Sequence, residues 1–396
     1  MPASSTNNNV EVLVLDGGFG TTLETLFLQD ISGPLWSARL IDTDPNLVVE
    51  AHKAFLASGA DIILTSTYQC SHSTFSRAGY TREDGERIKK KAVTLAKEAR
   101  DQHLADQNQS PSKKEPKIAL SLGSFGATLP GGEEFGGRYP PPFGPPALNK
   151  ANTFAEDESD LEEDSIRALT EFYLERLRVY VPVWDAIDYV AFETVPLRRE
   201  VRAIRRAMRV FLDELSPGLD SEGKQNDVKW WISTVWPEGL FPEVDKKGEH
   251  TISVKEVIAA LLGEREGEAR PWGVGVNCTF LEHVPKIVGE MEDSLGDFER
   301  GFRSLRKDES EKGDVLLPRP WLVVYPNGGD TYDGNTQTWI TNEEANGEQW
   351  ARKLWDVVSG VVERKAWSGV IVGGCCRTGP DEIGGLVRLI SPKEAS

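Results

Sequence analysis

Short apolar runs rich in β-branched and aromatic residues recur along the whole 396-residue chain, and this recurrence limits the possible folds more than any other feature. Most runs are separated by segments in which apolar side chains recur at helical spacing. Alternating strands and helices are typical of βα units around a parallel sheet. We identify eight such runs: Glu11 to Leu15, Asp61 to Thr65, Lys117 to Leu122, Asp188 to Phe192, Lys229 to Val235, Trp272 to Val276, Trp321 to Tyr325 and Gly369 to Val372.

The segment between the first two runs carries a complete helix signal. Asp44-Pro45 pairs a helix cap with proline at the first helical position, an apolar face extends from Leu47 to Phe55, and Gly59 ends it. Further helices, with apolar faces toward the sheet, are predicted over Gly85 to Arg100, from Asp160 to Tyr180, and after Pro196, Ser253 and Asn346.

Eight strand-helix repeats in a chain of this length favour an α/β fold that closes into a (β/α)8 TIM barrel, and a doubly wound open sheet is the alternative. We predict that residues 1–10 form a disordered or poorly ordered tail and that residues 11–396 form one barrel domain. The Gly- and Pro-rich stretch Pro130 to Pro146 is our candidate for a loop that closes over the site. Polar composition indicates surface insertions at Asp101 to Pro116, Ser216 to Asp227 and Glu292 to Lys312.

Charge and segment composition restrict the partners. The formal net charge of −18 repels phosphate backbones and anionic lipid surfaces. Met1 to Asn9 lacks the basic and apolar regions of a secretory signal, and no apolar run reaches the length of a transmembrane helix. We therefore expect a cytoplasmic protein, a monomer or small homo-oligomer, that acts on small molecules and binds neither nucleic acid nor membrane.

Four cysteines occur, Cys70, Cys278, Cys375 and Cys376, too few and too unevenly spread for a disulfide framework. In a barrel of this kind reactive groups lie at the carboxyl ends of the strands. Cys278 follows the sixth run and the other two expected site cysteines follow the eighth, which closure brings near the sixth. Three thiolates could therefore converge on one metal ion, whereas we leave Cys70 outside the set as a buried or incidental thiol.

Sharing a metal requires the chain to turn at Cys375-Cys376, because successive strand residues point to opposite faces. Gly373-Gly374 gives the backbone freedom for that turn. Three cysteine ligands would leave one tetrahedral position open, which is typical of catalytic zinc, and a substrate thiol bound there would become a nucleophilic thiolate. The alternative is that these cysteines are ordinary buried side chains, since no C-x-x-C spacing supports the metal.

Two carboxylates, Asp16 and Glu193, also lie at strand ends beside apolar runs, where an ionised group is costly unless it meets a cation or hydrogen-bond donors. A substrate ammonium would satisfy both. Capping of the next helix, or acceptance of backbone amides in the turn, is the structural alternative. Among aromatic residues near strand ends, Tyr68, Trp236 and Tyr325 could line a pocket for a methyl-sulfonium cation or could be core.

The remaining candidates carry less chemistry. The five histidines show no close ligand pairing, so surface or packing roles are expected for His52, His72, His103, His250 and His283. The glycine-rich strand ends lack the spacing and the Lys-Ser/Thr pair of a phosphate-binding loop.

With these features in place, the chain resembles the homocysteine S-methyltransferase family, a group of zinc barrels, over nearly its whole length. The matching segments are LDGGFGTTLE from Leu15, TSTYQ from Thr65, GSFGATLPGGEEFGGRY from Gly123, FETVP from Phe192, GVNCT from Gly275, VYPNGG from Val324 and GGCCRTGPDEI from Gly373.

Carried over position by position, the resemblance implies that Cys278, Cys375 and Cys376 hold Zn²⁺ and act in catalysis through it, and that Asp16 and Glu193 bind the homocysteine amino group.

It further implies that Tyr68, Asn277 and Asn327 are pocket residues. Gly379 and Glu382 stand where the family usually has threonine and histidine, which puts substrate contacts there in doubt.

The same resemblance implies a donor that gives its methyl group directly to homocysteine, because cobalamin and folate modules are not expected. S-methylmethionine or S-adenosylmethionine is the implied donor, and methionine the product. Two alternatives remain: a betaine-type donor held in an aromatic cage, and a non-catalytic zinc or redox-sensing barrel in which Cys375 and Cys376 form a vicinal disulfide.

Overall fold

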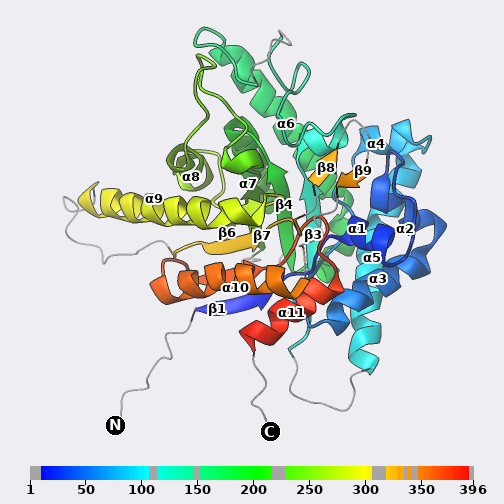
Figure 1. Cartoon of the computed structure of the whole chain (residues 1–396). Coiled ribbons are helices and arrows are strands. Elements are labelled where there is room, and N and C mark those ends of the chain that lie inside the picture. Colours follow the sequence, from blue (N-terminus) through cyan, green and yellow to red (C-terminus); the bar gives the residue numbers. More distant parts are fainter. Residues whose placement is uncertain are drawn as a thin grey trace, which may run out of the picture.

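The computed structural model describes residues 10–106, 114–146, 152–215, 228–305, 318–329, 331–333, 338–340 and 347–391. Within these ranges eight parallel strands form one sheet in the order β1-β10-β7-β6-β5-β4-β3-β2 (Figure 1). All eight predicted runs are strands of this sheet: β1 Glu11–Val14, β2 Ile62–Leu64, β3 Lys117–Gly123, β4 Tyr189–Val195, β5 Lys229–Thr234, β6 Gly273–Asn277, β7 Trp321–Tyr325 and β10 Gly369–Val372.

The sheet closes on itself where β1 meets β2. Leu15 forms an isolated parallel bridge with Ile62, and the Asp16 amide donates to the Ile62 carbonyl at 3.0 Å. Asp61 reinforces this seam, since its amide donates to the Val14 carbonyl at 2.7 Å and its carboxylate accepts from the Val14 amide at 2.8 Å. The predicted TIM barrel is therefore confirmed, and the open sheet is excluded.

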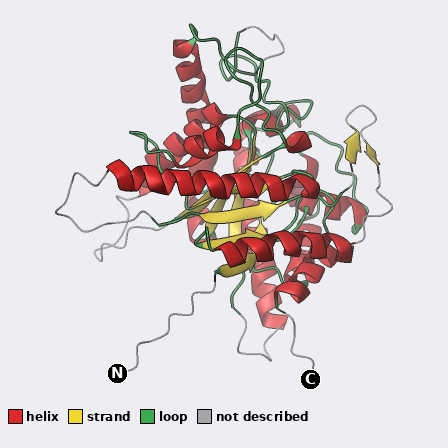
Figure 2. Cartoon of the chain, turned by 60° about the vertical axis from the view of Figure 1, so that its left-hand side comes forward, coloured by secondary structure: helices red, strands yellow, loops and turns green. Residues whose placement is uncertain are grey.

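Helices surround the barrel, as Figure 2 shows. The predicted helix after Asp44 begins as expected, because the Asp44 carboxylate accepts from the Leu47 amide at 3.2 Å and Pro45 takes the first helical position. The described α-helices are α1 Phe19–Thr25, α2 Leu40–Thr43, α3 Pro45–Ala57, α4 His72–Arg77, α5 Arg82–Asp106, α6 Ser159–Val179, α7 Arg198–Leu215, α8 Val254–Leu262, α9 Val284–Leu305, α10 Gly347–Arg364 and α11 Pro380–Ile390.

Two layers of apolar side chains hold the fold together. Alternate strand residues point into the barrel, where Leu15, Ile62, Trp231 and Tyr325 belong to one buried cluster. The other strand faces pack against the surrounding helices in a larger cluster. The carboxyl ends of the strands are thus set on a filled, rigid interior.

Two of the segments predicted as surface insertions are partly helical in the structure, so those predictions are wrong in part. Glu292 to Lys312 was expected to be a loop, but α9 continues to Leu305, because Met291 and Leu295 are buried at helical spacing inside an acidic segment. Asp101 to Pro116 begins as the last turns of α5. The insertion 216–227 lies outside the described residues, as do residues 1–9 of the predicted tail and residues 306–312.

A short antiparallel pair, β8 Thr331–Asp333 and β9 Thr338–Ile340, was not predicted. None of the described helices combines the length and apolar character needed to cross a membrane.

Candidate active site

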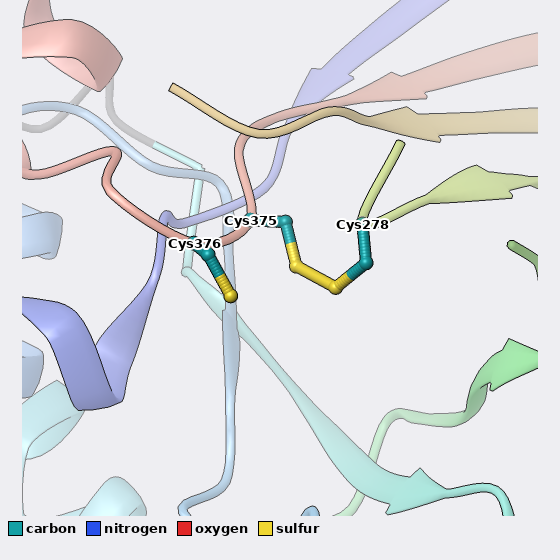
Figure 3. A group of neighbouring side chains, drawn as sticks. All are labelled: Cys278, Cys375 and Cys376. Carbon is teal, nitrogen blue, oxygen red and sulfur yellow. A yellow bond between two sulfur atoms is a disulfide. The ribbon is translucent and has the colours of Figure 1, made fainter. Parts of the chain in front are cut away.

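Three cysteine side chains meet at the carboxyl end of the barrel. Cys278 directly follows β6, and Cys375 and Cys376 lie on one turn after β10 (Figure 3). The three sulfur atoms all lie within 4.8 Å of one another. In this structure Cys278 and Cys375 are joined as a disulfide and Cys376 is free, which differs from the vicinal pairing considered from the sequence.

Close packing of strand ends brings the cysteines together. Gly373 and Gly374 do not adopt a positive φ, so the backbone freedom expected of them is the wrong explanation. A Cβ on Gly373 would lie 2.7 Å from the Asp16 carbonyl oxygen, and one on Gly374 would overlap the Thr378 side chain. Glycine is needed here because the eighth strand end presses against the first.

Three residues at the site hold a backbone conformation that side chains rarely adopt: φ is 59° at Thr194, 47° at Cys278 and 61° at Arg377. Hydrogen bonds maintain it. The Asn277 side chain accepts from the Thr194 amide and donates to the Thr194 hydroxyl, both at 2.8 Å. The Arg377 amide donates to the Thr21 hydroxyl at 3.0 Å. Of the seven such residues in the described part of the chain, three thus lie at the site.

Asp16 is fully buried at the end of β1. One carboxylate oxygen accepts from the Leu64 amide at 2.9 Å, and the other has no hydrogen-bond partner among the described residues. Burial, and to a smaller extent the nearby Glu193, raise the pKa of Asp16 well above its usual range. Asp16 therefore accepts a hydrogen bond from a backbone amide across the barrel seam, as the structural alternative predicts. Its second carboxylate oxygen has no partner among the described residues.

Glu193 is the second buried carboxylate. It accepts hydrogen bonds from the hydroxyls of Ser121 and Tyr325, yet burial raises its pKa to about 7. Two neighbouring anions without a cation repel each other. The pair is suited to bind an ammonium group.

The predicted pocket residues differ in what their side chains do. The side-chain oxygen and the side-chain nitrogen of Asn277 are both hydrogen-bonded to Thr194, so Asn277 holds the ends of β4 and β6 together. The Asn327 side-chain oxygen is buried without a hydrogen-bond partner among the described residues. Tyr68 is half-buried, and Arg176 fixes its position by donating to the Tyr68 carbonyl at 2.9 Å.

Sequence reasoning missed Glu134, a buried carboxylate in the turn that follows β3. Burial, and then the charge of Glu134, raise the pKa of both the Cys376 thiol and the Tyr68 hydroxyl. Glu134 lies in the Gly- and Pro-rich stretch Pro130 to Pro146, but nothing in the local pattern distinguishes it from the neighbouring Glu133.

Cys70 does not join the cluster. It is buried, its thiol lies 3.9 Å from the Ser66 carbonyl, and burial raises its pKa to about 11. His52 is also a packing residue: it is buried and stacks on Phe19 with ring centroids 4.4 Å apart.

A cavity of about 310 Å³ lies beside the Cys375-Cys376 turn. Gly379 and Glu382, the two positions that depart from the family pattern, are in its wall. The Glu382 carboxylate accepts from the Gly379 amide at 2.7 Å and so caps α11. The cavity is lined by Thr21, Thr22, Thr25, Leu26, Arg377, Thr378, Gly379, Pro380, Asp381 and Glu382.

The cysteine cluster has the donor set of a metal site. Burial, then Glu134, raise the pKa of the Cys376 thiol to about 12, so a thiolate there requires a cation. A metal ion supplies that charge, and three sulfur ligands leave a fourth position for substrate. Reduction of the Cys278–Cys375 bond would free the remaining two ligands.

Comparison with known proteins adds a family relationship. The family model "Homocysteine S-methyltransferase" matches residues 13–390. The homocysteine S-methyltransferase YbgG of Bacillus subtilis is 27% identical over 94% of this chain and 92% of its own, and homocysteine S-methyltransferase 2 of Arabidopsis thaliana is 31% identical over 93% and 90%. The metallated form of the homocysteine methyltransferase MmuM from Escherichia coli shares the fold, with a TM-score of 0.63, 22% identity and 96% coverage of both chains.

Proposed function

Because the chain belongs to the homocysteine S-methyltransferase family, a metal-dependent group, we propose that it transfers a methyl group from a sulfonium donor to the thiolate of L-homocysteine at a zinc site, giving methionine. The donor is S-methylmethionine or S-adenosylmethionine. The enzyme works on these small molecules in the cytoplasm, as a monomer or a small homo-oligomer.

The observation that carries this proposal is the meeting of three cysteine sulfurs with two buried carboxylates at one end of the barrel. In the reduced protein Cys278, Cys375 and Cys376 would hold the zinc. When bound, zinc lowers the pKa of a coordinated thiol so that the thiolate exists at neutral pH.

Protein side chains then orient the substrate. Asp16 and Glu193 bind the homocysteine ammonium and so direct its thiol toward the cysteine cluster. The donor sulfur leaves as a neutral thioether, which needs no proton, so no general acid or base is required in the transfer itself. The site contributes to catalysis by holding the thiolate in line with the methyl group of the donor.

The sulfonium donor follows from the family resemblance, and an aromatic pocket for either a sulfonium or the quaternary ammonium of betaine would require exposed aromatic faces. Of the three aromatic candidates, Trp236 and Tyr325 are 2% and 1% exposed. Their polar atoms are also used internally, since the Trp236 indole donates to Thr234 at 2.9 Å and the Tyr325 hydroxyl is hydrogen-bonded to Ser233. Betaine remains the alternative donor for testing.

The proposal is tested with protein purified under reducing conditions. We expect one zinc per chain and methionine formation from homocysteine with S-methylmethionine or S-adenosylmethionine, assayed in parallel with betaine. Cys376→Ser should lose zinc and activity together, whereas Cys70→Ala, a buried cysteine outside the cluster, should keep both. A zinc-free active wild type, or an active Cys376→Ser, contradicts the proposal.

A further inference from the structure

A third carboxylate, Glu134, is buried in the turn that follows β3 and has no assigned role in homocysteine or metal binding. It is 9% exposed, and its Oε2 atom is buried without a hydrogen-bond partner in the part of the chain that the structure describes. A buried charged group is costly unless a partner of opposite charge compensates it. Its position therefore indicates a cationic ligand.

The turn that carries Glu134 begins beside the site, because the Ser124 amide donates to the Glu193 carbonyl at 3.1 Å and the Gly123 amide donates to the Tyr68 carbonyl at 2.9 Å. In agreement with this placement, burial and then the charge of Glu134 raise the pKa of the Tyr68 hydroxyl. The adjacent Glu133 has a different environment, because it pairs with the exposed Arg138 at 3.4 Å. The two neighbouring glutamates thus differ, since Glu133 has a cationic partner and Glu134 has none among the described residues.

The backbone of the turn is held in place. Phe125–Thr128 forms a 3₁₀ turn directly against Glu133 and Glu134, and a Cβ on Gly126 would lie 2.5 Å from the Glu134 backbone nitrogen. At the far end of the turn the Tyr139 hydroxyl donates to the buried Glu200 carboxylate at 2.6 Å. Fixed at both ends, the turn keeps the Glu134 carboxylate near the site.

We propose that Glu134 binds the methyl donor, with its carboxylate against the positively charged sulfur. The inference rests on the proposed function. In that function Asp16 and Glu193 hold the homocysteine ammonium and the three cysteines hold the metal, so Glu134 is the buried anion that remains. A sulfonium offers no hydrogen-bond donor, and a charge contact in a site shielded from water is the interaction that selects it.

The transfer removes the charge that Glu134 recognises. The thiolate electron pair forms the new carbon–sulfur bond, and the pair of the breaking bond stays on the donor sulfur, which becomes a neutral thioether. Because the positive charge declines toward the transition state, the carboxylate stabilises the bound donor more than the transition state. Loss of Glu134 should therefore raise KM for the donor and leave kcat unchanged or slightly higher.

Steady-state kinetics of Glu134→Gln, with Glu133→Gln as the matched control, test this. We expect Glu134→Gln to raise KM for S-methylmethionine about tenfold or more, a loss typical of a hydrogen bond or contact to a charged group, with KM for homocysteine within about twofold. Glu133→Gln should behave as wild type. Glu134→Asp keeps the charge and should be intermediate, which separates a charge effect from damage to the turn.

A binding measurement isolates the charge. S-adenosylmethionine and S-adenosylhomocysteine differ in the sulfonium methyl, and calorimetry should show that wild type prefers the sulfonium while Glu134→Gln does not. An active wild type whose donor KM and sulfonium preference survive in Glu134→Gln overturns this inference alone. A wild type that forms no methionine from any donor overturns the proposed function and this inference with it.

Discussion

At the scale of single residues, the active site gathers buried carboxyl groups. Asp16, Glu134 and Glu193 are each buried, and burial is the first cause of the raised pKa of each. Such groups lower the stability of the empty protein and raise its affinity for cations. We therefore expect substrate binding and protein stability to respond in opposite directions when one of them is neutralised.

Replacing Glu193 by Gln should weaken homocysteine binding roughly 10- to 100-fold, because an amide does not pair with the ammonium. The empty protein should unfold at the same or a higher temperature, since a buried charge has been removed. Titration calorimetry with homocysteine and thermal unfolding check the two effects. Unchanged homocysteine affinity would contradict the assigned role, and Ser121→Ala, which removes only a hydrogen-bond donor, is the control.

His52 makes stability depend on pH. Burial lowers its pKa from 6.5 to about 3, so the folded protein keeps it neutral while the unfolded chain protonates it below about 6.5. Its contribution to stability is complete above pH 6.5 and is lost as pH falls toward 3.

Between pH 7.5 and 5.5 wild type should lose roughly 1.4 kcal/mol of unfolding free energy that His52→Phe does not lose. Denaturant unfolding of both proteins at the two pH values measures the difference. Equal losses would show that His52 is not the titrating group.

At the scale of elements, one carboxylate organises the helices beside the site. Glu200 on α7 accepts from the Phe125 amide and the Tyr173 hydroxyl of α6, each at 2.7 Å, and from Tyr139. These bonds tie α6, α7 and the turn that carries Glu134 into one unit. The stretch Pro130 to Pro146 is predicted to close over the site, and these bonds fasten its Tyr139 to α7.

Tyr139→Phe and Tyr173→Phe each remove one hydrogen bond to Glu200 and should destabilise the fold similarly, by about 1–3 kcal/mol. Only Tyr139→Phe loosens the Glu134 turn, so only that variant should raise KM for the sulfonium donor. Unfolding free energies and donor kinetics, measured together, check this. Equal donor KM values in the two variants would show that the position of the Glu134 turn does not affect donor binding.

At the scale of the whole molecule, the barrel is weakest where it closes. Among the described residues, seven pairs of barrel strands form ladders, whereas β1 and β2 share one isolated bridge supported by Asp16 and Asp61. The site spans this seam, because Asp16 belongs to both. Closure and substrate binding therefore depend on the same strand end.

Asp61→Ala should destabilise the protein by about 1–3 kcal/mol, since it leaves the Val14 amide without its carboxylate acceptor. The Glu11–Lys114 pair on the surface of the same strand is the control, and Glu11→Ala should cost less than about 1 kcal/mol. Hydrogen exchange at Val14 should accelerate in Asp61→Ala alone. Similar stability of the two variants would contradict a seam held by Asp61.

The sequence by itself determined the elements and the chemistry placed at their ends. Strand and helix periodicities are local, so all eight strands and the residues that follow them could be located from the pattern. The pattern failed where local signals conflict, as in α9, whose buried Met291 lies among charged neighbours.

Only the tertiary structure decided which of these residues meet. Cys278 and Cys375 are 97 positions apart, and their contact depends on barrel closure and on how closely glycine lets two strand ends approach. The burial of Glu134, and the pairing of the adjacent Glu133 with Arg138, depend on a turn anchored by a distant helix. Local periodicity carries no information about such distances, because they are set by the packing of segments remote in the chain.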